Sequence, residues 1–202
     1  MNLRNELPTA ENSSNFNAVS GATTKAGSTL ENLKAAVAGE TGASAKYAAF
    51  AKYAKEKGFD QLARLWEATS AAEQIHINLE ASLVEAEEPG YVRPTAEAPA
   101  PEAVDLNLIA SANGEIFETS DMYPSFIKKA QEEGNAKAVK VFTKAKLAEA
   151  VHAEKYLEAY NNIDAADDDA YYLCPGCGYI HKGDDFEKCP ICGAPKSKFQ
   201  RF

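Results

Sequence analysis

Two stretches of the sequence each carry a glutamate three residues before a histidine: Glu73 with His76, and Glu149 with His152. Residues three apart lie on one face of a helix, so each pair can direct a carboxylate and an imidazole to one point. A single pair of this kind is usually a solvated helix face. Because the chain has only three histidines and two of them occur in this motif, the repetition favours a metal site over chance.

Further carboxylates occur at corresponding places in two other helical stretches, Glu40 in one and Glu115 with Glu118 in the other. Each lies on the apolar stripe of its stretch, which should face the centre of a helical bundle. Five carboxylates in an apolar centre would repel one another and lose hydration, and two metal cations would remove both problems. Oxygen ligands with a minority of imidazoles suit iron or manganese, whereas zinc would bind without redox chemistry.

All four cysteines lie near the C-terminus, in the pairs Cys174/Cys177 and Cys189/Cys192. Each pair has the form Cys-Pro-x-Cys-Gly or Cys-Pro-Gly-Cys-Gly, whose proline and glycine suit a tight turn around a metal. Two such pairs predict a tetrahedral four-sulfur site. The spacing itself does not choose between zinc and iron, but a redox-active metal pair needs an electron supply, which favours iron here.

Four helices are expected to position the bundle ligands. Their predicted ranges are 28–57, 60–87, from 101–105 to 133, and 135–161. We expect Ser28 and Glu31 to form a capping box, Asp60 to be the N-cap of the second helix, and Pro124 to kink the third helix. The expected inward stripe of the second helix runs through Leu62, Trp66, Thr69, Glu73, His76 and Leu83.

A long connection at 88–103 contains four of the nine prolines and has no helical period. Such a crossover lets the second and third helices run in the same direction, as in a ferritin-like four-helix bundle. The predicted fold is therefore mainly α, with an N-terminal flexible arm at 1–27, the bundle at 28–163, a linker at 164–170 and a small metal-stapled domain at 171–202.

Composition narrows the choice of partners. The net charge of −9 argues against nucleic acid, because phosphate binding needs clustered lysine and arginine. No apolar run approaches the length of a membrane span, and residues 1–27 have no apolar signal segment. We therefore expect a cytoplasmic protein that has no membrane partner.

Taken together, these motifs resemble those of rubrerythrin over about residues 28–202. The matching segments are Gly39-Glu40, Glu73-x-x-His76, Glu115-x-x-Glu118 followed by Met122-Tyr123-Pro124, Glu149-x-x-His152, Cys174-Pro-Gly-Cys-Gly-Tyr and Cys189-Pro-Ile-Cys-Gly-Ala-Pro. The second glutamate at Glu118 and the fused rubredoxin-like tail are the discriminating parts.

The resemblance implies a peroxidase that reduces hydrogen peroxide to water. It implies that Glu73 and Glu149 bridge two irons, that one iron binds Glu40 with Glu118 when oxidised and His76 when reduced, and that the other binds Glu115 and His152. Tyr47 and Tyr123 match tyrosines near the site, and an equal alternative is that they are ordinary core aromatics.

The same resemblance implies a tail iron, held by Cys174, Cys177, Cys189 and Cys192, that passes on electrons from a rubredoxin or an NAD(P)H-dependent reductase. It also implies a head-to-tail homodimer. The alternatives are a ferritin-like ferroxidase or iron-handling protein, and a tail that is a structural zinc ribbon. His181 is expected to be a surface residue of the tail.

Overall fold

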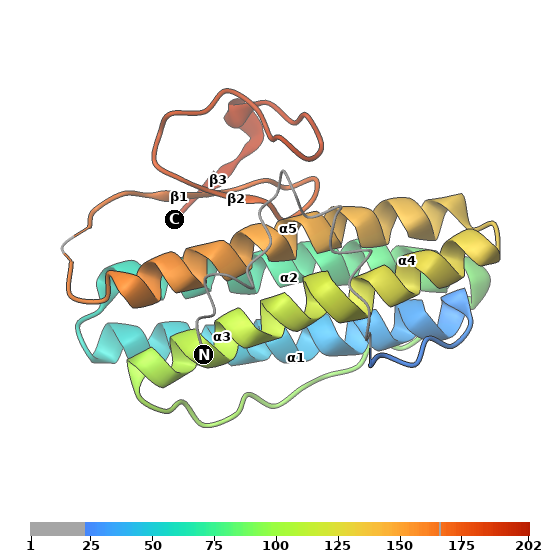
Figure 1. The fold of residues 1–202 in the computed structure, drawn as a ribbon, viewed down its shortest axis with the longest axis horizontal. Helices are drawn as coiled ribbons and strands as arrows, with labels where there is room; N and C mark the ends of the chain where they lie inside the picture. The colour runs from blue at the N-terminus through green and yellow to red at the C-terminus, as the bar shows by residue number, and fades with distance from the viewer. Residues whose placement is uncertain (1–22, 166) are drawn as a thin grey trace.

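The computed structural model describes residues 23–165 and 167–202, and a bundle of long helices forms its larger part (Figure 1). Residues 1–22 of the expected arm (1–27) therefore lie outside the described part of the chain. The helical elements are α1 (Thr29–Glu56), α2 (Asp60–Glu87), α3 (Val104–Phe117), the π-helical turn η3 (Glu118–Met122), α4 (Tyr123–Glu132) and α5 (Ala136–Asn161).

The first two helices form an antiparallel hairpin. The capping box is present, since Ser28 N–H donates to Glu31 Oε2 at 2.7 Å and Glu31 N–H donates to Ser28 Oγ at 3.2 Å. Gly58 takes a φ of 82° in the turn, a conformation that glycine adopts without strain. The predicted N-cap at Asp60 is wrong: Phe59 occupies that position without a side-chain cap, and Asp60 begins the helix, where its charge complements the helix dipole.

The connection over 88–103 runs along the length of the bundle as an irregular segment that contains no helix or β-strand (Figure 1). It returns the chain to the end at which α2 began, so α2 and α3 run in the same direction. This confirms the predicted ferritin-like crossover, and it brings ligands from four helices to one level of the bundle.

The third predicted helix is interrupted. The N–H of Tyr123 donates to the carbonyl of Glu118, five residues earlier, which is the π-helical pattern. Pro124, in the first turn of α4, has no N–H to continue the regular ladder. The prediction of a regular helix kinked at Pro124 is therefore corrected: the irregularity precedes the proline and begins at Glu118.

Two large apolar clusters lie at the two ends of the bundle, and Val37, Ile77 and Ala81 form a small third cluster. Trp66, Phe50 and Tyr156 belong to the first, and Phe126 and Phe142 to the second. On every helix the ligand-type residues fall between the members of these two clusters. The polar groups therefore form one layer inside the bundle, sealed by apolar packing on both sides.

The second helix departs from its predicted stripe after His76. Leu83 is only partly buried, while Glu80 and Val84 are fully buried. Steps of four residues from His76 lead to Glu80 and then Val84 at the centre of the inward face. The predicted Leu83 lies at the margin of that face, where it packs against a buried apolar cluster. Among the residues described, no helix has both the length and the apolar character needed to cross a membrane.

The tail folds as a three-stranded antiparallel sheet with the order β2-β1-β3. Its elements are β1 (Tyr171–Leu173), β2 (Ile180–Lys182), the 3-10 turn η4 (Lys196–Lys198) and β3 (Gln200–Arg201). It lies over α2 and α5, and Tyr171, Leu173 and Ile180 join the first apolar cluster of the bundle. The tail is thus packed on the bundle rather than held only by the linker.

Candidate metal centres and their contact

Six predicted ligands from four helices converge in the polar layer, and all six side chains are fully buried. They are Glu40 from α1, Glu73 and His76 from α2, Glu115 from α3, and Glu149 and His152 from α5. They make up two groups of four: Glu40, Glu73, His76 and Glu149, and Glu73, Glu115, Glu149 and His152. Within each group the candidate ligand atoms lie within 4.8 Å of one another.

Glu73 and Glu149 belong to both groups and turn one oxygen toward each histidine. The Nδ1 of His76 lies 2.7 Å from Glu149 Oε1 and 3.1 Å from Glu73 Oε2. The Nδ1 of His152 lies 2.7 Å from Glu149 Oε2 and 3.9 Å from Glu73 Oε1. This geometry suits two carboxylates that bridge a pair of metal ions.

The other ring nitrogen of each histidine faces the cysteine tail. His76 Nε2 lies 3.0 Å from the carbonyl oxygen of Cys177, and His152 Nε2 lies 2.8 Å from that of Gly178. A carbonyl only accepts hydrogen bonds, so each Nε2 must carry the proton. The Nδ1 lone pairs are then directed into the carboxylate cluster, which is the tautomer that a metal ligand needs.

The unpaired polar atoms of the cluster indicate that its residues suit metal cations. Eight ligand-type atoms of the cluster are buried without a hydrogen-bond partner among the described residues: both Nδ1 atoms, both oxygens of Glu73 and Glu149, and Oε2 of Glu40 and Glu115. Leaving so many buried polar atoms unpaired would be costly, whereas two cations would bind all of them.

The pKa shifts of the cluster residues indicate that the site lacks positive charge when no metal is bound. Burial raises the pKa of Glu115 to about 8 and that of Glu40 well above its ordinary range. Burial opposes protonation of His76, but the carboxylates of Glu149, Glu73 and Glu40 together outweigh it and raise the pKa of the ring well above 6.5. Protons are thus drawn to the positions that metal ions would take.

Glu118, the seventh predicted ligand of the bundle, is placed differently. It begins η3, is partly buried, and is absent from both groups of converging atoms. Burial, followed by the charge of Glu115, raises its pKa well above the ordinary range. The structure therefore brings His76 rather than Glu118 into the cluster, although Glu118 lies close enough that its charge, after burial, helps to raise the pKa of Glu40.

Two predicted tyrosines donate hydrogen bonds to cluster carboxylates. The hydroxyl of Tyr47 donates to Glu115 Oε1, and that of Tyr123 contacts Glu40 Oε1. Burial raises the pKa of both phenols well above 10, so both stay neutral and able to donate. Their hydroxyl groups therefore orient carboxylates of the cluster, which goes beyond ordinary core packing.

One polar residue of this layer was missed by sequence reasoning. Glu80, on α2, is fully buried, and its Oε1 lies 2.9 Å from the Tyr123 hydroxyl. Burial raises its pKa to about 8. The signal was present in the spacing, since Glu80 follows Glu73 by seven residues and His76 by four, which places all three on one helix face.

The four cysteines of the tail also converge, with three of the side chains buried. The Sγ atoms of Cys174 and Cys192 are 3.4 Å apart, as are those of Cys177 and Cys189, too far for disulfides. Two equivalent turns hold them: Gly178 N–H donates to Cys174 O, and Gly193 N–H donates to Cys189 O. Both glycines have positive φ, 78° and 77°.

The expected surface residue His181 is partly exposed and lies 2.9 Å from Asp185.

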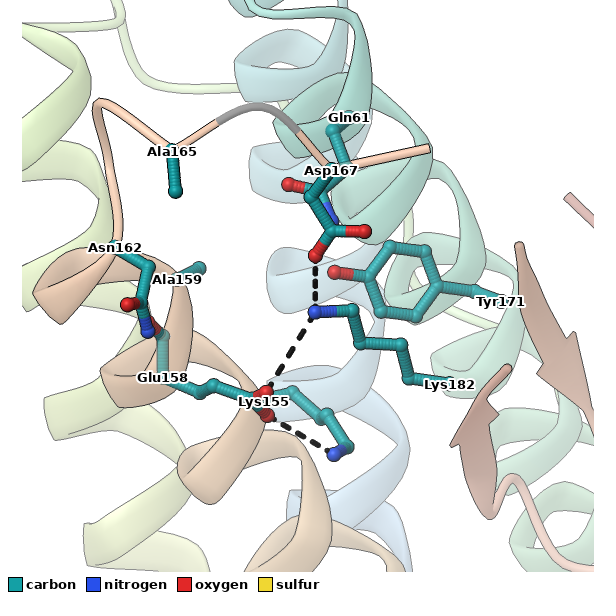
Figure 2. Close-up of a pocket in the computed structure, with 9 residues that line it drawn as sticks. All are labelled: Gln61, Lys155, Glu158, Ala159, Asn162, Ala165, Asp167, Tyr171 and Lys182. Carbon is teal, nitrogen blue, oxygen red and sulfur yellow. Dashed lines mark hydrogen bonds and ion pairs between the residues drawn. The ribbon is translucent and has the colours of Figure 1, made fainter. Parts of the chain in front are cut away.

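A polar cavity of about 250 Å³ separates the linker from the bundle (Figure 2). The Nζ of Lys182, on β2, pairs with Asp167 of the linker and lies 3.6 Å from Glu158 Oε1 of α5. Glu158 also pairs with Lys155 at 3.1 Å. Both lysines that line the cavity are therefore paired with carboxylates. The ion pairs of Lys182 connect the tail to the linker and to α5 beside this cavity.

A helical bundle with a two-metal carboxylate–histidine cluster, joined to a four-cysteine domain, defines the class of di-iron bundle proteins with a rubredoxin-like tail. Residues 31–160 match the family model described as rubrerythrin, and residues 172–200 match that of the rubrerythrin, rubredoxin-like domain. The chain belongs to the rubrerythrin family, whose members are oxidoreductases. It has the family's di-iron site and its four-cysteine site.

Two proteins of Nitratidesulfovibrio vulgaris are among the relatives. Nigerythrin is 66% identical over the whole length of both chains, and rubrerythrin is 35% identical over 87% of this chain and 95% of its own. The solved structures of nigerythrin in a partially reduced state and in a fully reduced, all-ferrous state each match with a TM-score of 0.92 over the whole of both chains.

Proposed function

We propose that this protein reduces hydrogen peroxide to water at the bundle metals, with electrons delivered through the four-cysteine site. The observation that carries the proposal is the pair of hydrogen bonds from His76 and His152 to the carbonyls of Cys177 and Gly178. Each histidine reaches a metal position with one nitrogen and the backbone of a cysteine turn with the other. A short covalent and hydrogen-bonded path thus joins the two sites.

We infer the ligand roles from this geometry together with the family resemblance. Glu73 and Glu149, which belong to both groups, would be shared by two irons. Glu40 and His76 would hold one iron, and Glu115 and His152 the other. By the family resemblance, Glu118 would take the place of His76 as a ligand in the oxidised protein, because a carboxylate favours Fe(III) and a neutral imidazole favours Fe(II). When bound, the two irons supply two electrons and act as Lewis acids toward the peroxide.

The rest of the chain orients these groups and keeps water out. Tyr47 and Tyr123 hold the carboxylates of Glu115 and Glu40, and the two apolar clusters seal the layer. Residues 28–163 thus form the reaction domain and 171–202 the electron-entry domain, joined by 164–170. Iron rather than zinc in the tail is supported by its contact with the histidines, and the red colour of ferric four-sulfur iron checks the metal.

The test uses the full chain loaded with iron and reduced without oxygen. We expect hydrogen peroxide to reoxidise it much faster than oxygen does; equal or reversed rates would contradict peroxidase activity. A ferroxidase or storage protein would instead react readily with oxygen and assemble into a large hollow cage, which light scattering would detect.

A variant separates the two sites. Cys174→Ser should react once with peroxide after chemical reduction but lose turnover driven by a protein donor, while Lys198→Ser, an exposed change in the same domain, should keep it. Donor-driven turnover by Cys174→Ser at the normal rate would contradict electron entry through the tail. We further propose that the electron donor is a rubredoxin or an NAD(P)H-dependent reductase. We also propose that the protein forms a head-to-tail homodimer and is cytoplasmic.

A further inference from the structure

Glu80 is a buried acid that the ligand assignment leaves without a role. Its side chain is fully buried, and it belongs to neither metal-binding group of the described residues. Its Oε2 has no hydrogen-bond partner in the described part of the chain. An ionised carboxylate placed there would lose its hydration with little compensation.

The hydroxyl of Tyr123 lies between two carboxyl groups. It is 2.9 Å from Oε1 of Glu80 and also contacts Oε1 of Glu40. A phenol has one proton and can donate only one hydrogen bond, so one of the two carboxyl groups must be protonated and donate to the phenol oxygen. Glu40 is grouped with Glu73, His76 and Glu149, where a metal ion keeps a carboxylate ionised. The proton therefore belongs to Glu80.

We propose that Glu80 is the internal proton donor for peroxide reduction and delivers its proton through the Tyr123 hydroxyl to Glu40 at the metal pair. This inference rests on the proposed function. Glu80 itself touches neither substrate nor metal position and acts through Tyr123.

The reaction balances with this donor. Hydrogen peroxide takes up two electrons from the iron pair and two protons, its O–O bond breaks, and two waters form. One proton starts at Glu80: it moves to the phenol oxygen while the phenol's own proton moves to Glu40 and on to a product oxygen. The second proton comes from solvent. Glu80 is left ionised and takes a proton from solvent before the next turnover, while electrons return through the tail.

Glu80→Gln is the discriminating variant. Glutamine keeps the size of the side chain, and its amide N–H can still donate to Tyr123, but it has no proton to transfer. If Glu80 only supports the packing of Tyr123, glutamine should serve equally well. Glu87→Gln is the matched control, because Glu87 is exposed at the end of the same helix.

The experiment compares iron-loaded, fully reduced wild type, Glu80→Gln and Glu87→Gln. After mixing with peroxide, we expect reoxidation of Glu80→Gln to be slower by about 100-fold or more, because general-acid catalysis typically contributes about 10²–10⁴-fold. Its rate should also show a larger effect of D₂O. Independently of activity, the infrared C=O band of a protonated carboxyl should be present in reduced wild type and Glu87→Gln and lost in Glu80→Gln. Tyr123→Phe should slow the reaction similarly, and the double variant should be no slower than either one.

Several results would overturn the relay: a wild-type rate in Glu80→Gln, persistence of the infrared band, additive slowing in the double variant, or loss of iron from Glu80→Gln. Failure of the proposed function looks different, since wild type itself would then not be reoxidised by peroxide. In that case the infrared band still decides whether Glu80 holds the proton.

Discussion

Gly178 is the point at which the tail touches the metal cluster most closely, and Gly178→Ala tests whether that contact carries electrons. A Cβ at this position would collide with the His76 ring, approaching Nε2, Cε1 and Cδ2. The residue also has a φ of 78°, which costs an L-residue about 1–2 kcal/mol. Alanine there must push the turn away from the histidines.

The expected size of the effect follows from the bonds lost. Displacing the turn breaks the hydrogen bonds from His76 and His152 to the tail carbonyls, each worth about 1 kcal/mol net. A loss of about 2 kcal/mol weakens docking of the tail about 30-fold. Donor-driven peroxide turnover should fall by at least about tenfold, while chemically reduced protein should still react once with peroxide at the normal rate.

The chain contains a matched control for this experiment. Gly193 occupies the equivalent position in the second cysteine turn with a φ of 77°, and a Cβ there meets no atom within 4 Å. Gly193→Ala therefore has the same backbone strain without the collision. The assay is steady-state turnover beside single-turnover reoxidation, with iron content measured for both variants. Equal turnover by Gly178→Ala and Gly193→Ala would refute the reasoning.

Two further predictions concern the metals and the assembly. Without metal, Glu115 has a folded-state pKa raised from 4.5 to about 8, so its contribution to stability is full below 4.5 and is lost as the pH rises toward 8. The melting temperature of chelator-treated protein should fall over that interval and that of iron-loaded protein should not; parallel curves would contradict the metal-site assignment. The tail lies on the bundle of its own chain, so mixing Cys174→Ser with Glu149→Gln chains should restore no turnover, because neither chain has both sites intact. Recovery of about a quarter of wild-type turnover in randomly mixed dimers would contradict the intrachain path and show that each tail serves the partner's bundle in a head-to-tail dimer.

Much of the site could be predicted from local spacing. Glu73 with His76 and Glu149 with His152 share helix faces because the helix repeats every 3.6 residues, whatever surrounds it. The two cysteine turns are equally local. The long connection over 88–103 indicated the bundle topology, since it is too long for a tight turn and too rich in proline for a helix. These features depend on residues close together in the chain.

Only the tertiary structure decided which groups meet across elements. Glu118 follows Glu115 by three residues yet stays outside both groups of converging ligand atoms, which the helix period could not predict. Glu80 is connected to the cluster by its hydrogen bond with Tyr123, which lies 43 residues away in the sequence. The contact of His76 with Cys177 spans 101 residues and two domains. Periodicity determines the face that a residue occupies, whereas its partners depend on how separate elements pack, and that packing is set by the whole chain.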